Sequence, residues 1–197
     1  VKRTPAAEYG IRRARFAAIN LKGEDELVGM VQVDPDDKDD IVLITQTGMA
    51  LRFKLDTVSC TGRATAGVRG IDVAKNDAVR WFEIPKAGTM LFVVSDRGFG
   101  KRMLCDDIER QGRAGKGQKL LPMNKSGETG QMLAACLNVT EAKAVRVEQK
   151  HGHVTTLDVS EISVQRRTAK GELLVNVLLD DVVEYAALAG DMQEKTE

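Results

Sequence analysis

The sequence has few of the features that mark membrane, secreted or metal-binding proteins. Its longest apolar stretches, such as residues 41–44 and 90–94, are far shorter than the roughly 20 residues that cross a membrane. Its three cysteines include no C-x-x-C pair, which argues against a zinc site or a disulfide framework and favours buried, reduced thiols. We therefore expect a cytoplasmic protein that does not contact a membrane and holds no metal.

Aromatic residues and net charge are also scarce. Only 4% of the residues are aromatic, which argues against the base-stacking platforms of single-strand binders. The 29 basic and 29 acidic residues cancel, so composition alone does not indicate a nucleic-acid partner. Hydrophobic residues make up 43%, which is ample for a packed core. Because the chain begins with Val1 and not with Met, we expect it to be a piece of a longer protein.

The sequence does contain an internal repeat of about fifty residues. A β-hairpin signal, an apolar run followed by a glycine turn and a second strand, occurs around Gly48, Gly98 and Gly152, which are 50 and 54 residues apart. A basic loop keeps the same step, because Arg13, Arg63, Arg113 and Arg167 are spaced by 50, 50 and 54 residues. Two landmarks with one shared, varying period indicate a repeat architecture.

Each repeat reads as a short strand, one helical turn, a basic loop and then alternating strands. The helical turns are expected near residues 6–9, 55–59, 105–111 and 158–164. This pattern predicts an all-β fold, a propeller-like array of about four four-stranded blades. We expect one domain over residues 1–190, with repeats of about 1–50, 51–99, 100–153 and 154–190, and an acidic tail at 191–197.

Several strings in this order resemble a known family. They are DELVG (residues 25–29), GRATAGVRGI (62–71), GFGKR (98–102) and VSEIS (159–163). The chain is similar to the C-terminal β-pinwheel domain of the A subunits of DNA gyrase and topoisomerase IV, the bacterial type IIA topoisomerases. The family's heptapeptide QRRGGKG is only echoed, as QGRAGKG (111–117) and QRRTAKG (165–171), and the first loop, IRRARFA (11–17), has no glycine.

The resemblance implies a DNA-wrapping domain and no active site on this chain. It implies three partners, namely double-stranded DNA, the remainder of the A subunit, and the ATPase B subunit of an A2B2 enzyme, and a nucleoid-associated location. ATP and Mg²⁺ would serve the intact enzyme, and this chain would hold no cofactor. The family's cleaving tyrosine follows an arginine, whereas Tyr9 and Tyr185 both follow glutamate.

The loops have the chemistry of phosphate binding. Arginine binds phosphate oxygens with two parallel hydrogen bonds, and small residues let a backbone approach them closely. For a single loop, arginines that only solvate a surface turn are a plain alternative, which four loops in register make less favoured. The predicted DNA-binding residues are Arg12, Arg13, Arg15, Arg52, Arg63, Arg69, Arg102, Arg113, Lys116, Lys119, Arg166, Arg167 and Lys170.

Two other classes of function compete with DNA bending. A propeller-like protein-interaction scaffold would have the same repeats, with incidental arginines. A stand-alone enzyme is disfavoured, because no nucleophile, carboxylate pair or ligand cluster recurs. The glycine-rich string at 112–117 is followed by Gln118, so it lacks the Lys-Ser/Thr ending of a phosphate-binding P-loop.

Overall fold

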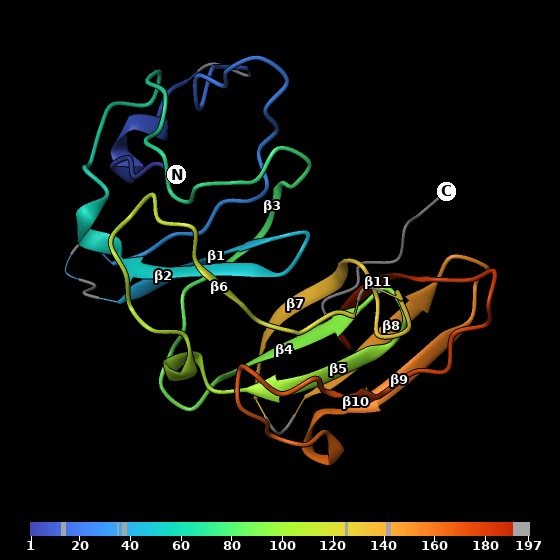
Figure 1. Cartoon of the computed structure of the whole chain (residues 1–197). Coiled ribbons are helices and arrows are strands. Elements are labelled where there is room, and N and C mark those ends of the chain that lie inside the picture. The colour runs from blue at the N-terminus through green and yellow to red at the C-terminus, as the bar shows by residue number, and fades with distance from the viewer. Residues whose placement is uncertain (13–14, 35, 37–38, 125, 141–142, 191–197) are drawn as a thin grey trace.

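The computed structural model describes residues 1–12, 15–34, 36, 39–124, 126–140 and 143–190. It is an all-β structure, as expected (Figure 1). Its strands are β1 (Asp40–Thr45), β2 (Met49–Lys54), β3 (Val79–Glu83), β4 (Met90–Ser95), β5 (Phe99–Met103), β6 (Gln118–Lys119), β7 (Leu133–Val139), β8 (Ala144–Gln149), β9 (Val154–Asp158), β10 (Glu172–Leu173) and β11 (Val183–Leu188). Within the described ranges, no helix has the length and apolar character needed to span a membrane.

Short 3-10 helices confirm the predicted helical turns. They are η1 (Ala6–Tyr9), η2 (Leu55–Thr57), η3 (Cys105–Asp107) and η4 (Val159–Glu161). The last three directly follow, or lie one residue after, the second strand of a hairpin. Each therefore ends a hairpin and leads the chain into a basic loop.

Three antiparallel sheets are built around the three predicted hairpins. Their strand orders are β3-β1-β2-β6, β10-β5-β4-β7 and β11-β8-β9. In each sheet the first hairpin strand pairs with the strand that follows the basic loop, as Ile44 pairs with Trp81. The second hairpin strand of the first two sheets pairs with a two-residue strand from the next unit, as Ala50 pairs with Gln118. Sheets thus combine segments of successive sequence repeats.

The hairpin turns explain two sequence signals. Gly48, Gly98 and Gly152 have φ values of +83°, +77° and +87°, which side chains disfavour. Asp77 caps the first turn, because its carboxylate accepts hydrogen bonds from the Thr47 N–H at 3.0 Å and the Thr47 hydroxyl at 2.6 Å. Burial acts to raise the pKa of Asp77, but these and neighbouring hydrogen bonds hold it below its usual value.

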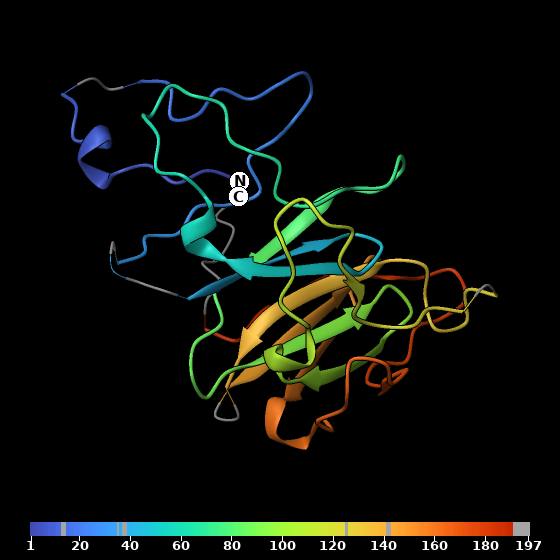
Figure 2. The same cartoon turned by 60° about the vertical axis from the view of Figure 1, so that its left-hand side comes forward.

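The hydrophobic core lies between units. One cluster joins Val42 and Ile44 of β1 to Leu91 and Val93 of β4, and a second joins the β4–β7 sheet to the β8–β11 sheet. A third lies between the first sheet and the N-terminal segment, where Val1 and Val33 pack on it. Because each unit packs on its neighbours, the units follow one another from the N-terminal segment to the C-terminal sheet (Figures 1 and 2).

Two parts of the structure differ from expectation. The described residues of the segment 1–34 form no sheet, and their strand-like feature is a single parallel bridge between Arg3 and Cys60. Cys105 and Cys136 are buried, and burial raises the pKa of Cys105 to about 11, but Cys60 is exposed, so the expectation of buried thiols is wrong for it. The predicted acidic tail, 191–197, lies outside the described residues.

Candidate nucleic-acid interface

The basic loops form one continuous row. This loop row comprises residues 11–12, 15–20, 61–70, 111–119 and 165–171. The Asn20 N–H donates to the Thr65 carbonyl at 3.2 Å, and the Ala114 N–H donates to the Gly70 carbonyl at 2.7 Å. The Arg167 guanidinium donates to the Lys119 carbonyl at 2.9 Å and joins the last loop to the one before it. Loops fifty residues apart are therefore in direct contact.

Three arginines at equivalent positions link these loops. Arg113 donates through Nη1 to the Arg69 carbonyl at 2.7 Å, as Arg167 does to Lys119, and Arg63 donates in the same way to Ala17. The Nε of each arginine is buried, with no hydrogen-bond partner among the described residues. Arg63 also lies over the ring of Phe16, 5.3 Å from its centroid. We call Arg63, Arg113 and Arg167 the loop-linking arginines. Arg13, their predicted counterpart, lies outside the described residues.

Arg52 and Arg102 face inward, which corrects their assignment as DNA contacts. Arg102 is 5% exposed, and it donates to the carbonyls of Ile162 at 2.6 Å and Ser160 at 3.2 Å. Arg52 likewise donates to the Cys105 carbonyl at 3.1 Å. Each side chain therefore holds the 3-10 helix of the following unit, and neither guanidinium is free to meet a phosphate.

Arg52 also belongs to a buried ion-pair group. Its Nε lies 2.6 Å from the Asp40 carboxylate, whose side chain is 5% exposed, and Arg110 contacts the same oxygen at 2.9 Å. Burial acts to raise the pKa of Asp40, but hydrogen bonds from Arg110 and Arg52 outweigh it and hold the pKa below its usual value. These contacts fix the first hairpin against the loop that starts at Arg110.

Lys119 is also engaged with the protein. It is half-buried, and its ammonium donates to the Thr47 carbonyl in the first hairpin turn. Burial lowers the pKa of Lys119, and the nearby Asp77 carboxylate opposes that effect. We therefore remove Lys119, with Arg52 and Arg102, from the expected contact set.

Apart from the loop-linking arginines and Arg13, the remaining predicted residues are exposed. They are Arg12, Arg15, Arg69, Lys116, Arg166 and Lys170. Arg69 makes a loose ion pair with Asp72 at 3.6 Å, and the other five side chains bond to no other described residue. We call these six residues the outward cations. They lie on loops whose sequences, including the whole of residues 11–22, contain no aspartate or glutamate.

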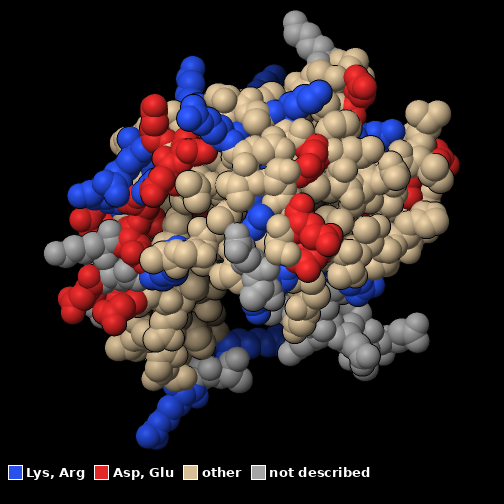
Figure 3. All heavy atoms as spheres, turned by 90° about the horizontal axis from the view of Figure 1, so that it is seen from below, with Lys and Arg blue, Asp and Glu red and all other residues tan. Residues whose placement is uncertain are grey.

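Acidic and basic side chains are mixed on the face of the molecule that Figure 3 shows. A phosphate backbone approaching such a face meets repulsion as well as attraction. The loop row has cations and no carboxylate of its own, although Asp72 pairs with Arg69 and Glu8 accepts from the Arg63 N–H.

The loop glycines serve a different purpose from the one expected. A Cβ on Gly117 would lie 2.4 Å from the Ala50 carbonyl oxygen, and one on Gly171 would lie 2.6 Å from that of Gly100. Both glycines have positive φ values, of +77° and +80°. They let each loop cross the hairpin of the preceding unit at backbone contact. The expectation that small residues make room for phosphate is therefore not needed to explain these two glycines.

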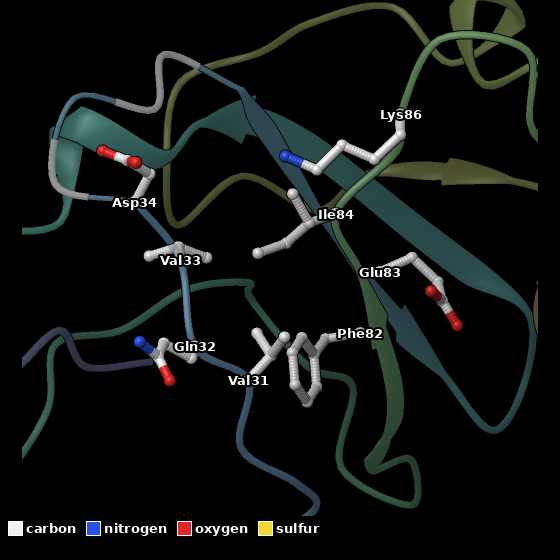
Figure 4. A pocket seen from close by; sticks show the side chains of 8 residues that line it. All are labelled: Val31, Gln32, Val33, Asp34, Phe82, Glu83, Ile84 and Lys86. Atoms are coloured by element: carbon white, nitrogen blue, oxygen red, sulfur yellow. The ribbon is translucent and has the colours of Figure 1, made fainter. Parts of the chain in front are cut away.

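Two shallow hollows of the surface lie away from the loop row. One is lined by residues 31–34 and the end of β3, where Phe82 and Ile84 point toward residues 31 and 33 and Glu83 lies on the other side of the strand (Figure 4). Burial raises the pKa of Glu83 to about 7, although the Asn138 N–H opposes this by bonding to the carboxylate. The candidate interface is thus an open surface and not a pocket.

Comparison with known proteins agrees with this fold. A family model described as the DNA gyrase C-terminal domain, β-propeller, matches residues 1–34, 39–86, 89–129 and 156–189. The chain belongs to this family. It is 36% identical to the DNA gyrase A subunit of Deinococcus deserti over 189 residues, covering 93% of this chain and 23% of the relative. It is 31% identical to that of Salmonella typhimurium over 184 residues, covering 93% and 20%.

Solved structures of the DNA gyrase C-terminal domain family share the architecture. The C-terminal domain of DNA topoisomerase IV superposes with a TM-score of 0.86 at 22% identity, covering 95% of this chain and 58% of that one. The DNA gyrase A C-terminal domain gives a TM-score of 0.67 at 21% identity, covering 77% and 50%. The chain spans about a fifth of the length of the curated relatives it matches.

Proposed function

We propose that the loop row binds the backbone of duplex DNA and bends it. The observation that carries the proposal is the series of outward cations on loops that touch one another and contain no acidic residue. Membership of the gyrase C-terminal domain family supports it. The proposed contacts are Arg12, Arg15, Arg69, Lys116, Arg166 and Lys170, together with Arg13, which keeps its predicted role.

The chemistry of these contacts favours the backbone over the bases. Guanidinium and ammonium groups bind phosphate oxygens, which carry no sequence information. The described loops contain no helix that could enter the major groove, and Phe16 is their single aromatic residue. Binding should therefore be sensitive to salt and nearly independent of sequence, and it should favour duplex over single-stranded DNA.

Bending follows from the way the loops are fixed. The loop-linking arginines and the glycine crossings hold each loop against its neighbour and against a hairpin. A straight rod would meet only part of such a row, because successive units turn relative to one another (Figures 1 and 2). Smooth bending by 40–90° costs roughly 1–6 kcal/mol, which a few charge-assisted phosphate contacts offset.

Membership of the family supports a proposed role in a larger enzyme. The chain would hold a DNA segment and so determine which DNA crossing is presented to a cleavage site elsewhere in the enzyme. ATP would be hydrolysed by the B subunit of an A2B2 assembly. In this role the chain itself has no active site and binds neither ATP nor Mg²⁺. Tyr9 has a structural role in this proposal, because its hydroxyl donates a hydrogen bond to the Ala18 carbonyl at 3.3 Å.

Fluorescence anisotropy with a labelled 30-base-pair duplex tests the proposal. We expect log K to fall linearly with log salt, by about 0.9 for each phosphate contact, with little change when the sequence is scrambled. Absence of binding at low salt would contradict the proposal and favour a protein-interaction scaffold.

A further inference from the structure

Lys101 lies buried beneath the last loop of the row. It belongs to β5, it is fully buried, and it forms no ion pair with a described carboxylate. Its ammonium donates to the carbonyls of Arg166 at 2.9 Å, Arg167 at 2.7 Å and Ala169 at 2.6 Å. All three acceptors belong to the loop that presents Arg166 and Lys170 to solvent. One buried cation thus holds three backbone carbonyls of a single loop.

The equivalent positions in two other units are occupied by a leucine and by a lysine. Leu51 occupies the place of Lys101 beneath the loop 111–119, where a Cβ on Gly115 would meet its Cδ1 at 3.4 Å. Lys2 occupies it beneath the loop 61–70, and its ammonium donates to the Arg63 carbonyl. An apolar side chain therefore supports the loop 111–119, whereas three carbonyls of the last loop accept hydrogen bonds from the Lys101 ammonium.

We propose that Lys101 is a positioning residue, and that its protonated ammonium sets the arrangement in which Arg166 and Lys170 meet DNA. This rests on the proposed function of the loop row. The ammonium has three N–H donors for three carbonyls, so each acceptor is satisfied. A neutral amine has two donors, so loss of the proton leaves one of the three carbonyls without its lysine donor. We expect the loop to rearrange so that this carbonyl finds another donor.

The surroundings of Lys101 place this change near physiological pH. Burial lowers the pKa of Lys101 to about 8, the neighbouring Arg167 acts in the same direction, and Asp107 of η3 opposes them. Across the sheet, Lys101 pairs with the uncharged Val93, and the nearby Glu172 of β10 bonds to Ser163. Phosphates bound at Arg166 and Lys170 would favour the charged ammonium, so DNA binding should take up a proton near pH 8.

The test compares Lys101→Met with Lys54→Met, which removes an exposed charge outside the loop row. Anisotropy titrations at fixed salt are run from pH 7 to pH 9. If DNA raises the pKa of Lys101 by one unit, the unmodified chain and Lys54→Met lose about fivefold in affinity over this range. Lys101→Met should bind several-fold more weakly at pH 7 and change little with pH. A profile for Lys101→Met that parallels the unmodified chain would overturn the proposal.

A second measurement needs no variant and no DNA. In the unmodified chain with ¹³C-labelled lysine, the Lys101 Cε signal and the amide signals of residues 166–170 should titrate together with a midpoint near 8. Loop amides that ignore the Lys101 titration would refute the coupling even if Lys101→Met fails to fold. If the coupling is found and the chain does not bind DNA, the proposed function fails while the positioning of the loop stands.

Discussion

The hairpin arginines and the outward cations are chemically alike but occupy opposite surroundings. Arg52 and Arg102 lie on strands, and their guanidinium groups donate hydrogen bonds to backbone carbonyls of the next unit. Arg166 and Lys170 lie on a loop and are exposed. Arg52 and Arg102 are 50 residues apart, and Lys116 and Lys170 are 54 residues apart, so members of both sets recur with the repeat. The comparison shows that a basic residue that recurs with the repeat has the same role in each unit. Burial decides whether that role is to hold neighbouring units together or to bind a ligand.

The largest effect on stability is expected when an inward arginine is removed. Arg102→Ala leaves the buried Ile162 carbonyl without its donor, removes the bond to Ser160 and opens space in the interface between units. We expect the free energy of unfolding to fall by about 3 kcal/mol. Chemical denaturation measures it, with Arg166→Ala as the exposed control. A loss below about 0.5 kcal/mol would contradict the role given to Arg102.

A smaller loss is expected from a loop crossing. Gly171→Ala places a Cβ against the Gly100 carbonyl at a φ of +80°, so it should cost about 2 kcal/mol. Gly112 offers a matched control, because a Cβ there meets nothing within 4 Å and its φ is not positive. Thermal unfolding of the two variants compares them. Equal melting temperatures would show that the crossing does not constrain the loop.

The ion pairs of Asp40 should make stability depend on pH. Because the pKa of Asp40 is lowered in the folded chain, its contribution is present above the usual carboxyl pKa of 3.8 and is lost as pH falls through the folded value. Asp40→Asn should therefore destabilise the chain by about 1–2 kcal/mol at pH 7, and by progressively less as pH falls below 3.8 and through the lowered pKa of Asp40. Urea titrations across this range provide the check, and a difference that does not change with pH would refute the assignment.

The smallest effect on stability is expected at the outward cations. The side chains of Arg166, Lys170 and Lys116 make no bond to another described residue, so replacing all three by alanine should change the free energy of unfolding by no more than about 0.5 kcal/mol. Circular dichroism during urea titration measures this change. A loss comparable with that of Arg102→Ala would mean that these side chains help to hold the fold.

Much of the fold could be predicted from periodicity, because hairpin glycines and alternating strands are local signals. Gly48 and Gly98 lie in hairpin turns whose positive φ values strongly favour glycine. Hairpins that recur in this way predict the all-β class. The strands β2 and β6 lie in different repeats, and β6 is only two residues long, so no local sequence signal predicts that they pair. The same limit applies to the interface. Arg52 and Lys116 are both basic and both recur in the next repeat, as Arg102 and Lys170, and their different surroundings depend on contacts between units.

One available signal did separate Arg52 from the outward cations. Arg52 lies in alternating strand sequence, between buried Leu51 and Phe53. Arg102 follows Lys101 in the strand FGKRM, which does not alternate, and its inward position carries no such signal. Arg166 and Lys116 lie among small and polar residues without alternation. Basic residues inside a strand pattern are better interpreted as part of the sheet, whereas those in glycine- and alanine-containing loops are candidates for a ligand.

Energy transfer between dyes at the two ends of a 30-base-pair duplex tests the central claim most directly. At saturation with the unmodified chain at low salt, we expect the end-to-end distance to shorten, and we expect Arg166→Ala/Lys170→Ala/Lys116→Ala to weaken both the shortening and the salt dependence of binding. Arg63, Arg113 and Arg167 remain in that variant, so the row keeps its links. An unchanged end-to-end distance on DNA saturated with the unmodified chain would contradict the account.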